Sequence, residues 1–478
     1  MVVTTNVKTK YNWNVVIWLI LLAIAFIYVF LPFAVVFLFR VPEIASLCSN
    51  IFASTPGTIV AAATLTMIMM NNVNMIGKQV GWQAKVLLTF ALVLALFRYL
   101  MDSSSYILWD ISQIKQQEPF PLSGKVAIVT GANKGIGFEA AKLLAADLGA
   151  HVVLTCRTIS RCRDVVAAVN DAAQTSQSGG SARSMALELS SLESAKDLVE
   201  ALNTDAVIRE TGIHVLFNHA GMSPTEHLTK EGLEDGFGGM YLAHMALTLG
   251  ILPLLEKGAM MSSAHHRGPS RVVITSSEAL LFAAQNVFGD AFHSSLFEGD
   301  GEGDLRGERT LARKEPATMQ AYSRAKLAST LFCFELNRRL QAKYRELPSP
   351  LVIVHTLHPG PVLTTSSCAG VSNMLESIPG MGWMITRIMM PLLWRSPRSA
   401  ARILLYAGLS NDPSVMTRGG AYINSMGHPV VSSLDHVTTS AQYDAVLQAD
   451  EKYSQRLWEV SVRLIAQSPA SAVVQNAP

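Results

Sequence analysis

The sequence predicts a doubly wound α/β domain built on a parallel sheet, preceded by a hydrophobic helical region in a membrane. From about residue 120 onward, short runs rich in Val, Ile and Leu alternate with helix-length segments. That alternation is typical of parallel strands covered by helices on both faces. Before this point long apolar runs dominate. A mean hydropathy of +0.29 with only 15% charged residues is too apolar for an ordinary soluble protein of 478 residues.

Residues 15–39 are the clearest membrane-spanning candidate because they contain no charged side chain. As a helix this run would be about 37 Å long, more than the roughly 30 Å of hydrocarbon in a bilayer. A second apolar run covers residues 85–101, and residues 58–76 between them are apolar but contain three asparagines. The sequence leaves two or three spans open within residues 15–101, after an N-terminal segment of residues 1–14.

The membrane region makes the lipid bilayer an expected partner. We expect an integral protein of the endoplasmic reticulum or another endomembrane, with the following domain on the cytosolic side. The lysines near the apolar runs do not settle this orientation, because they lie both before the first run and between the later ones.

Charge and cysteine content exclude several other classes. A net charge of +2 provides no basic stripe, so nucleic acid is not an expected partner. The five cysteines are odd in number, scattered and without CxxC spacing. They argue against a disulfide framework and against a zinc or other metal site, and they favour a reducing environment.

The α/β domain is expected over residues 120–466, after a linker at 102–119 and before a flexible tail at 467–478. Ligands of doubly wound sheets bind beyond the carboxyl ends of the strands, so functional residues should follow these runs directly. The predicted strands are residues 125–130, 151–156, 184–189, 214–218, 271–276 and 351–357.

The first predicted strand is followed by "TGANKGIG", residues 130–137, which leads straight into a helical segment. Gly131, Gly135 and Gly137 let the backbone turn sharply and approach a pyrophosphate at the helix N-terminus. The spacing is GxxxGxG rather than GxGxxG, and no GK[ST] follows, which disfavours a nucleoside-triphosphatase loop.

A second motif is "YSRAK", residues 322–326. Tyr322 and Lys326 are four residues apart and share one face of a helix. Alone, this spacing is also that of an ordinary surface pair, so its meaning depends on the other motifs.

Four motifs in this order resemble the short-chain dehydrogenase/reductase family: TGANKGIG, "NHAG" (218–221), "SS" (276–277) and YSRAK. The resemblance covers about residues 120–466 and implies a Rossmann-type fold. Within the family the chain is most similar to the membrane-bound, NADP-preferring retinol dehydrogenases, through "HPGPVLT" (358–364) and "RLWEVSVRLI" (456–465). The apolar residues 381–397 lie where those enzymes have a segment that covers the substrate and touches the bilayer. Family members often pair through helices, so a homodimer is compatible with the resemblance.

The resemblance also assigns roles to residues. Tyr322 is the acid/base, and Lys326 lowers its pKa. Ser276 or Ser277 holds the substrate oxygen, and the family pattern favours Ser277. The expected cofactor-binding residues are Gly131, Asn133, Lys134, Gly135, Ile136, Gly137, Arg157, Glu188, Leu189, Asn218, Ala220, Gly221, Tyr322, Lys326, Pro359, Gly360 and Thr364.

The second predicted strand ends "TCR" without the acidic residue that NAD enzymes of this shape place there. Arg157 and Lys134 could instead bind the 2′-phosphate of NADP(H), or they could be solvated surface charges. We therefore expect NADP(H) as the cofactor.

Three features depart from the family pattern. Met240 stands at the position of the catalytic asparagine, and a thioether cannot relay a proton as an amide does. His244 could take over that role, or the relay is weakened, or the alignment is shifted. His219 replaces the second asparagine of NNAG. A glycine-rich acidic run, residues 297–315, lies between Ser277 and Tyr322, where we expect a solvated loop.

The expected function is that of a membrane-anchored NADP(H)-dependent oxidoreductase. Its substrate would be a lipophilic alcohol or the matching aldehyde or ketone, of the retinoid, steroid or fatty aldehyde class. One alternative is a catalytically silent NADP-binding sensor or scaffold, motivated by Met240 and the insertion. Another is an enzyme for polar carbonyls, which requires residues 381–397 to pack away from the membrane and the pocket.

Overall fold

The computed structural model describes residues 120–221, 227–261, 268–285, 317–364 and 394–478, except single positions at 417, 426, 440 and 476, together with Lys115, Pro224, Thr386 and Met390. The expected membrane region, residues 15–101, lies outside the described residues, and so do the N-terminal segment and most of the linker.

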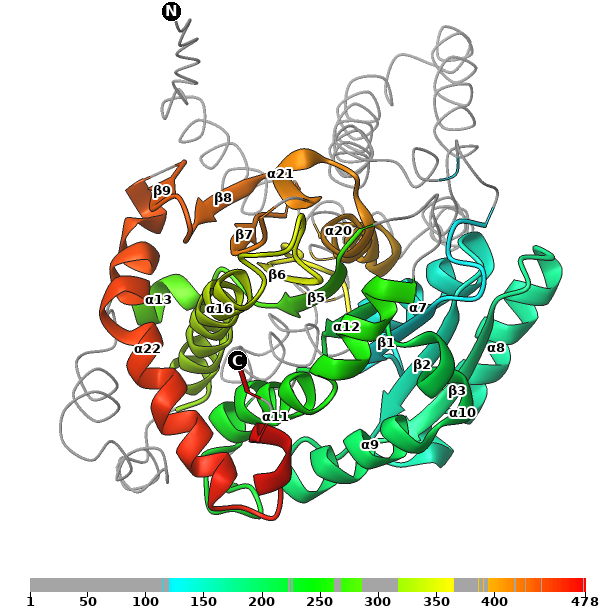
Figure 1. Cartoon of the computed structure of the whole chain (residues 1–478), viewed down its shortest axis with the longest axis horizontal. Helices are drawn as coiled ribbons and strands as arrows, with labels where there is room; N and C mark the ends of the chain where they lie inside the picture. The colour runs from blue at the N-terminus through cyan, green and yellow to red at the C-terminus, as the bar shows by residue number, and fades with distance from the viewer. Residues whose placement is uncertain are drawn as a thin grey trace, which may run out of the picture. The chain divides into compact units, whose positions relative to one another are not determined.

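The described strands form one sheet in the order β3-β2-β1-β4-β5-β6-β7-β8-β9 (Figure 1). All pairings from β3 to β7 are parallel, and those of β8 and β9 are antiparallel. The strands are β1 (Val126–Thr130), β2 (His151–Cys156), β3 (Ser181–Ala186), β4 (Val215–Asn218), β5 (Ser270–Thr275), β6 (Val352–Leu357), β7 (Ala421–Ile423), β8 (Pro429–Ser432) and β9 (Val437–Thr438).

Helices connect the parallel strands. They are α7 (Gly135–Lys142) with its π-helical continuation η1 (Leu143–Asp147), the 3-10 turn η2 (Ile159–Cys162), α8 (Arg163–Thr175), α9 (Leu192–Thr204), α10 (Ala206–Thr211), the π-helix η3 (Gly236–Leu242), α11 (Ala243–Gly250), α12 (Leu252–Met261), α13 (Leu280–Ala284), α16 (Ala317–Lys343), α20 (Pro397–Leu409), α21 (Pro413–Met416), η5 (Ala441–Tyr443), α22 (Asp444–Ala466) and η6 (Ser471–Val474).

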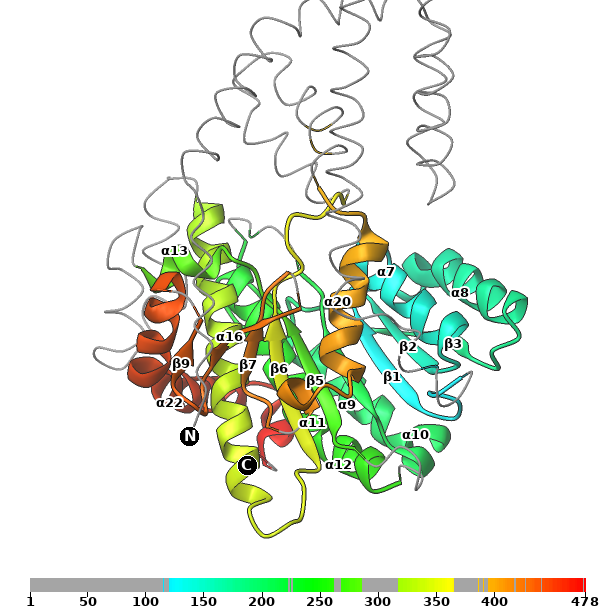
Figure 2. The same cartoon turned by 90° about the horizontal axis from the view of Figure 1, so that it is seen from above.

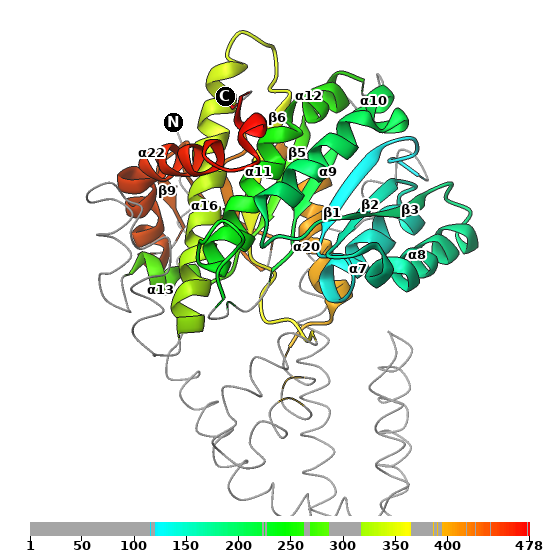
Figure 3. The same cartoon turned by 90° about the horizontal axis from the view of Figure 1, so that it is seen from below.

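Both faces of the sheet are covered, which explains the near-continuous apolar runs of the central strands. Residues on one face of the sheet pack against α9, α11, α16 and α22, and residues on the other face pack against α7, α8 and α20. Figures 2 and 3 view the domain from opposite sides: α20 lies in front of the sheet in one, and α9, α11 and α12 lie in front in the other. Every residue of β1, β5 and β6 is buried. The doubly wound, Rossmann-type fold predicted from the sequence is confirmed.

The strand order reverses direction at β1, whose neighbours are β2 on one side and β4 on the other. In such sheets the connections leave β1 and β4 toward opposite faces, which opens a crevice at their carboxyl ends. Thr130 and Asn218 end these two strands. The motifs singled out from the sequence follow β1, β4, β5 and β6 at this edge.

The structure corrects two expectations from the sequence, one about the third strand and one about residues 467–478. The third strand is residues 181–186 rather than 184–189, because this edge strand is partly exposed and lacks a continuous apolar run. Residues 467–478, expected as a flexible tail, contain η6 (Ser471–Val474), whose Val473 is buried in the core. The Pro478 carbonyl accepts a hydrogen bond from Arg339 at 3.2 Å, which fastens the end of the chain to α16.

Candidate active site

The turn between β1 and α7 packs so tightly that it requires glycine. Gly131 has a φ of +69°, and a Cβ atom there would lie 2.6 Å from the Cα of Ala220. A Cβ atom on Gly137 would lie 2.6 Å from the carbonyl oxygen of Gly131. Only glycine therefore allows the turn after β1 to fold against the turn after β4.

The same turn fits the pyrophosphate of a dinucleotide. α7 begins at Gly135, and the side chain of the preceding Lys134 makes no capping hydrogen bond within the described residues. The first N–H groups of a helix have no intrahelical acceptor and favour an anion. Thr364 packs next to Gly135, since a Cβ atom built on Gly135 would be 3.4 Å from Cγ2 of Thr364. Ile136 is buried beneath the turn, whereas Asn133 and Lys134 are exposed at its rim.

Thr130 joins the two strand ends that form the crevice. Its hydroxyl oxygen accepts hydrogen bonds from the backbone N–H groups of His219 (2.8 Å) and Ala220 (2.9 Å). It also lies 3.0 Å from Nε2 of His244. Sequence analysis did not single out Thr130. The signal was present, however, because a buried polar residue ends an otherwise apolar strand.

Asn218 and Gly221 form the floor of the crevice next to β4. The Asn218 amide donates a hydrogen bond to the Thr248 hydroxyl at 2.8 Å. Its Oδ1 is buried and has no hydrogen-bond partner among the described residues. A Cβ atom on Gly221 would lie 3.8 Å from Nζ of Lys326, so this turn borders the YSRAK helix directly. Residues from three of the four motifs thus meet here.

Tyr322 and Lys326 lie side by side on α16, as their spacing predicts. Nζ of Lys326 is 5.5 Å from the centre of the Tyr322 ring and donates a 2.8 Å hydrogen bond to the carbonyl oxygen of Thr275. Burial lowers the pKa of Lys326 to about 8. The backbone of Thr275, at the end of β5, thus positions the ammonium group, a role that sequence analysis missed because any residue type can supply a carbonyl.

The expected effect of Lys326 on Tyr322 is corrected in one respect. Burial is the largest influence on Tyr322 and raises the pKa of its hydroxyl, while a hydrogen bond with Ser277 acts in the opposite direction. The phenol is therefore protonated at neutral pH and is set up to donate a proton.

The two candidate serines have different surroundings. The Ser276 hydroxyl donates to the Lys326 carbonyl oxygen at 3.1 Å and accepts a 2.9 Å hydrogen bond from Thr330, so it fastens β5 to α16. The Ser277 hydroxyl instead interacts with Tyr322. This geometry favours Ser277 as the residue that faces a substrate oxygen.

Met240 approaches the position expected for the family's asparagine. A Cβ atom on Gly221 would lie 3.9 Å from Sδ of Met240 and 3.8 Å from Nζ of Lys326. Met240 lies in η3, and π-helical turns of this kind often occur at functional sites. The methionine therefore borders the turn after β4.

The two histidines near the site play different parts. Nδ1 of His244 lies 2.9 Å from the Met240 carbonyl, to which it must donate, so Nε2 accepts from Thr130. Both nitrogens are bonded within the fold, and burial lowers the pKa of His244 to about 4. His244 therefore does not replace the asparagine as a relay. Nδ1 of His219 lies 3.0 Å from the Thr275 hydroxyl, and burial lowers the pKa of His219 to about 3.

The loop after β6 carries Pro359, Gly360 and Thr364. Gly360 has a φ of +79°, and its N–H donates to Nδ1 of His358 at 3.3 Å. Nε2 of His358 lies 3.3 Å from a carboxylate oxygen of Glu278, the residue after Ser277. This contact links the loop after β6 to the loop after β5.

Arg157 and Glu188 follow neighbouring strands β2 and β3 and form an ion pair at 2.6 Å. Leu189 comes next, and its carbonyl would lie 3.5 Å from a Cβ atom on Gly239 in η3. Three of the expected cofactor-binding residues, Arg157, Glu188 and Leu189, thus lie together beyond the ends of β2 and β3.

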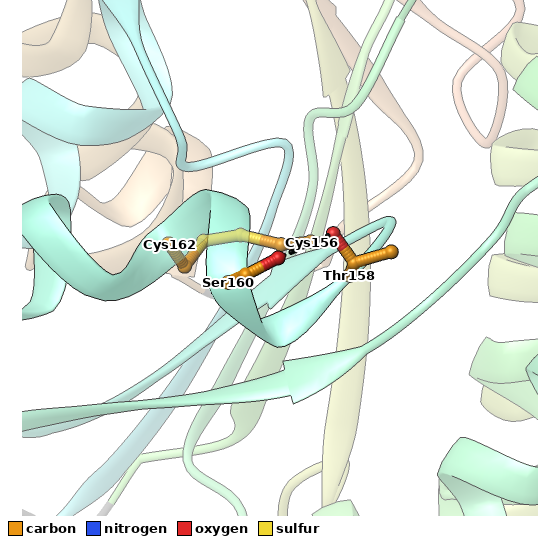
Figure 4. The surroundings of a disulfide bond; sticks show 4 residues. All are labelled: Cys156, Thr158, Ser160 and Cys162. Carbon is orange, nitrogen blue, oxygen red and sulfur yellow. Dashed lines mark hydrogen bonds between the residues drawn. A yellow bond between two sulfur atoms is a disulfide. The ribbon is translucent and has the colours of Figure 1, made fainter.

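Cys156 and Cys162 flank Arg157 and are joined by a disulfide, with Cα atoms 6.2 Å apart (Figure 4). The sequence argues against a disulfide framework, and this pair closes only a short loop, with a sequence separation of 6. The 3-10 turn η2 folds back on the end of β2 and brings the two side chains together. Within the loop they enclose, the hydroxyls of Thr158 and Ser160 are 3.2 Å apart.

Other sequence expectations lie outside the described residues, including the acidic insertion at 297–315 and nearly all of residues 381–393. In the part of the chain that the structure describes, no single helix is both long and apolar enough to cross a membrane. One pair, Gly236–Gly250 and Leu252–Met261, meets the length and composition criteria together but is bent by 52°.

Comparisons with known proteins agree with this geometry. Residues 125–287 match the family model described as short chain dehydrogenase. The chain is 30% identical over 350 residues to the WW domain-containing oxidoreductase of Gallus gallus, covering 72% of this chain and 69% of that protein. It is 30% identical over 346 residues to retinol dehydrogenase 13 of Mus musculus, covering 72% and 84%.

A solved structure of L-sorbose reductase from Gluconobacter frateurii, complexed with NADPH and L-sorbose, is 18% identical with a TM-score of 0.45. The match covers 65% of this chain and 98% of that one. The fold and the site define an oxidoreductase that uses a nicotinamide dinucleotide. The chain belongs to the short-chain dehydrogenase/reductase family and is similar to its retinol dehydrogenases.

Proposed function

We propose that this chain is a membrane-anchored, NADP(H)-dependent oxidoreductase that interconverts a lipophilic alcohol and its aldehyde or ketone. The observation that carries the proposal is the meeting of Tyr322, Lys326 and Ser277 beside a glycine-lined turn that fits a dinucleotide. The glycine-rich turn after β1 would hold the pyrophosphate, and the loops after β4 and β6 would enclose the rest of the cofactor.

A bound nicotinamide supplies the hydride in reduction and accepts it in oxidation. The Ser277 hydroxyl would donate a hydrogen bond to the substrate oxygen and orient it toward Tyr322. In reduction, Tyr322 gives its phenolic proton to that oxygen as negative charge develops there. The ammonium group of Lys326, fixed by the Thr275 carbonyl, then stabilises the phenolate. Tyr322 is protonated at neutral pH, and this is the form that carbonyl reduction requires.

Two considerations support the finer parts of the proposal. The name of the similar retinol dehydrogenases points to a lipophilic alcohol, and residues 15–39 and 381–397 would hold the domain near a bilayer that contains such substrates. Arg157 follows β2 and the exposed Lys134 lies in the turn after β1, and both could bind a 2′-phosphate.

The test is oxidation of NADPH by the detergent-solubilised protein in the presence of retinal, a steroid ketone or a long-chain fatty aldehyde. We expect turnover with at least one of these carbonyls. Tyr322→Phe should lower the rate by about 10²-fold or more, because it removes the proton donor. Turnover only with small polar carbonyls would contradict the lipophilic class, and full activity of Tyr322→Phe would contradict the mechanism.

Met240 favours a second candidate, a dinucleotide-binding sensor or scaffold without turnover. Its thioether borders Gly221, and the sequence resemblance places the family's amide at this position. NADPH binding and carbonyl turnover by the wild type separate the two functions. A scaffold would bind NADPH without turnover in the wild type, whereas an enzyme would turn over substrate with methionine in place.

A further inference from the structure

Four polar side chains from different parts of the fold meet beside the reacting groups. Glu278 follows Ser277 in the loop after β5, and His358 begins the loop after β6. Tyr422 lies on β7, the neighbour of β6, and Tyr443 ends η5. The proposed reaction uses none of these four residues, which together form the Glu278 cluster.

The members of the Glu278 cluster contact one another directly. The ring of Tyr422 stacks on that of His358, with centroids 5.8 Å apart, and packs against that of Tyr443 at 5.7 Å. Oε1 of Glu278 accepts a 3.3 Å hydrogen bond from the Tyr443 hydroxyl and lies 3.3 Å from Nε2 of His358. The same two neighbours therefore hold Tyr422 and Glu278 at adjoining positions. Burial, followed by the charges of Tyr443, Glu278 and Tyr322, raises the pKa of the Tyr422 hydroxyl, so these three groups lie near it.

Two polar atoms of the cluster have no hydrogen-bond partner among the described residues. The Tyr422 hydroxyl is buried and unpaired. Both contacts recorded for Glu278 are made by Oε1, so Oε2 remains available. An unpaired buried hydroxyl destabilises a fold unless a ligand or a water completes it. Because 54% of the Glu278 side chain is exposed, a ligand can reach the cluster from that side.

The two unpaired atoms define the kind of group that fits between them. A phenol can donate a hydrogen bond, whereas a carboxylate oxygen accepts one. An alcohol hydroxyl does both, so it would satisfy Tyr422 and Glu278 at once. An ether or a second carbonyl would satisfy only Tyr422, and a plain hydrocarbon chain would leave both atoms unpaired.

We infer that Tyr422 and Glu278 form a subsite that binds a hydroxyl group on the substrate, close to the carbonyl that is reduced. The substrate class is then a lipophilic hydroxy aldehyde or hydroxy ketone, with the corresponding diol as its reduced form. Tyr422 donates a hydrogen bond to the substrate hydroxyl, which donates in turn to Oε2 of Glu278. His358 and Tyr443 are positioning residues for these two. The inference rests on the proposed oxidoreductase function and deepens it.

The test compares kcat/KM for nonanal with that for nonanal bearing a hydroxyl on its second, third or fourth carbon, using the full-length protein in detergent with NADPH. The wild type should prefer at least one hydroxylated aldehyde by about tenfold or more, because the plain chain leaves the subsite unpaired. Tyr422→Phe should lower this preference about tenfold, the value of one hydrogen bond. Glu278→Gln exchanges a charged acceptor for a neutral one and should lower it about fivefold.

Tyr344→Phe is the matched control. The Tyr344 hydroxyl also donates to a glutamate, Glu256 at 2.5 Å, but it lies beyond the opposite end of α16 from Tyr322. Its removal should leave the preference unchanged. Thermal unfolding separates the two phenols further. Tyr422→Phe removes an unpaired hydroxyl and should not lower Tm, whereas Tyr344→Phe breaks a buried hydrogen bond and should lower it.

Three results would overturn the subsite. The first is a wild type without preference for any hydroxylated aldehyde, which would mean that only water completes the cluster. The second is the full wild-type preference in folded Tyr422→Phe. The third is turnover of retinal or a steroid ketone but of none of these aldehydes. Failure of the wild type to reduce any carbonyl would instead reject the proposed function itself.

Discussion

Lys326 is the residue on which the chemistry of the site depends most. Its ammonium group is almost fully buried, and burial lowers its pKa from 10.5 to about 8. The one hydrogen-bond acceptor recorded for it is a neutral backbone carbonyl, that of Thr275, which compensates for only part of the lost hydration. The charge is thus present at neutral pH but is easily lost. In the unfolded chain the same side chain would remain charged up to about pH 10.5, so its burial destabilises the fold below pH 8, and this penalty is relieved as the pH rises from 8 to 10.5.

This pKa predicts a pH dependence for carbonyl reduction. As the pH rises through about 8, Lys326 loses its proton and can no longer stabilise the phenolate of Tyr322, so the rate should fall. The Tyr322 hydroxyl, whose pKa burial raises, should titrate well above this limb. The measurement is the rate of NADPH oxidation with saturating carbonyl between pH 6 and 10. A rate that stays constant up to pH 10 would show that the charge on Lys326 is not needed.

Adjacent serines provide a matched pair of substitutions. Ser277→Ala removes a donor to the substrate oxygen and should lower kcat by about 10²-fold, the usual effect of losing one such donor. Ser276→Ala removes a buried hydroxyl that joins Lys326 and Thr330 and should cost about 1 kcal/mol of unfolding free energy with little effect on kcat.

Steady-state rates and urea unfolding of both serine variants separate these effects. If Ser276→Ala showed the larger loss of kcat while keeping its stability, the roles of the two serines would have to be exchanged.

At the scale of elements, substitution by alanine should have different effects at Gly131, in the turn between β1 and α7, and at Gly124, which precedes β1. Gly131→Ala must place a Cβ atom 2.6 Å from the Ala220 backbone, so the turns after β1 and β4 should separate and NADPH affinity should fall more than about tenfold. Gly124 has a similar φ of +74° but no atom within 4 Å of an added Cβ.

Gly124→Ala is therefore the control, because it adds only the strain of the left-handed conformation, about 1 kcal/mol. Calorimetry with NADPH and thermal unfolding of both variants measure the difference. Equal losses of affinity would mean that strain alone, and not the close approach to Ala220, makes glycine necessary at position 131.

The sequence predicted the elements whose burial is complete. The apolar runs at 125–130, 214–218, 271–276 and 351–357 coincide with strands to within one residue at each end. β3 was displaced because it lies at the edge of the sheet, where exposure interrupts the apolar pattern. β7, β8 and β9 have two to four residues each, which is too short for a periodic pattern to identify them.

The candidate site was predictable where a motif fixes a residue type, as for the glycines, Tyr322 and Lys326. It was not predictable where the function is carried by the backbone or by distant contacts. Three examples depend on which strand ends become neighbours. They are the hydrogen bond from Lys326 to the Thr275 carbonyl, the contacts of both His244 nitrogens with Thr130 and Met240, and the Arg157–Glu188 ion pair. The pKa of Tyr322 was predicted in the wrong direction because burial, which the sequence does not reveal, raises it more than the hydrogen bond with Ser277 lowers it.

At the scale of the whole molecule, the α/β domain and the apolar N-terminal region follow different physical rules. Within the domain, buried strands alternate with helices and place the reacting groups at one edge of the sheet. In the first hundred residues, the uncharged run 15–39 satisfies the length requirement for a helix in hydrocarbon. A bilayer-bound domain of this kind can receive lipophilic substrates laterally, which connects the N-terminal region to the proposed function.

We therefore predict that the full-length protein behaves as an integral membrane protein. It should remain with the membrane pellet after extraction with alkaline carbonate, because removing residues 15–39 from hydrocarbon exposes an entire apolar helix to water. Release into the supernatant would contradict a membrane span.

Protease treatment of intact vesicles, with tags at the two ends of the chain, then determines the topology. A cytosolic domain requires digestion of the C-terminal tag in sealed vesicles, and its protection would place the domain in the lumen. Two spans within residues 15–101 return the chain to the side where it started, so both tags would be digested together. Three spans put the tags on opposite sides, and only the C-terminal one would be lost. The same experiment thus decides whether residues 58–76, with their three asparagines, cross the bilayer or lie at its surface.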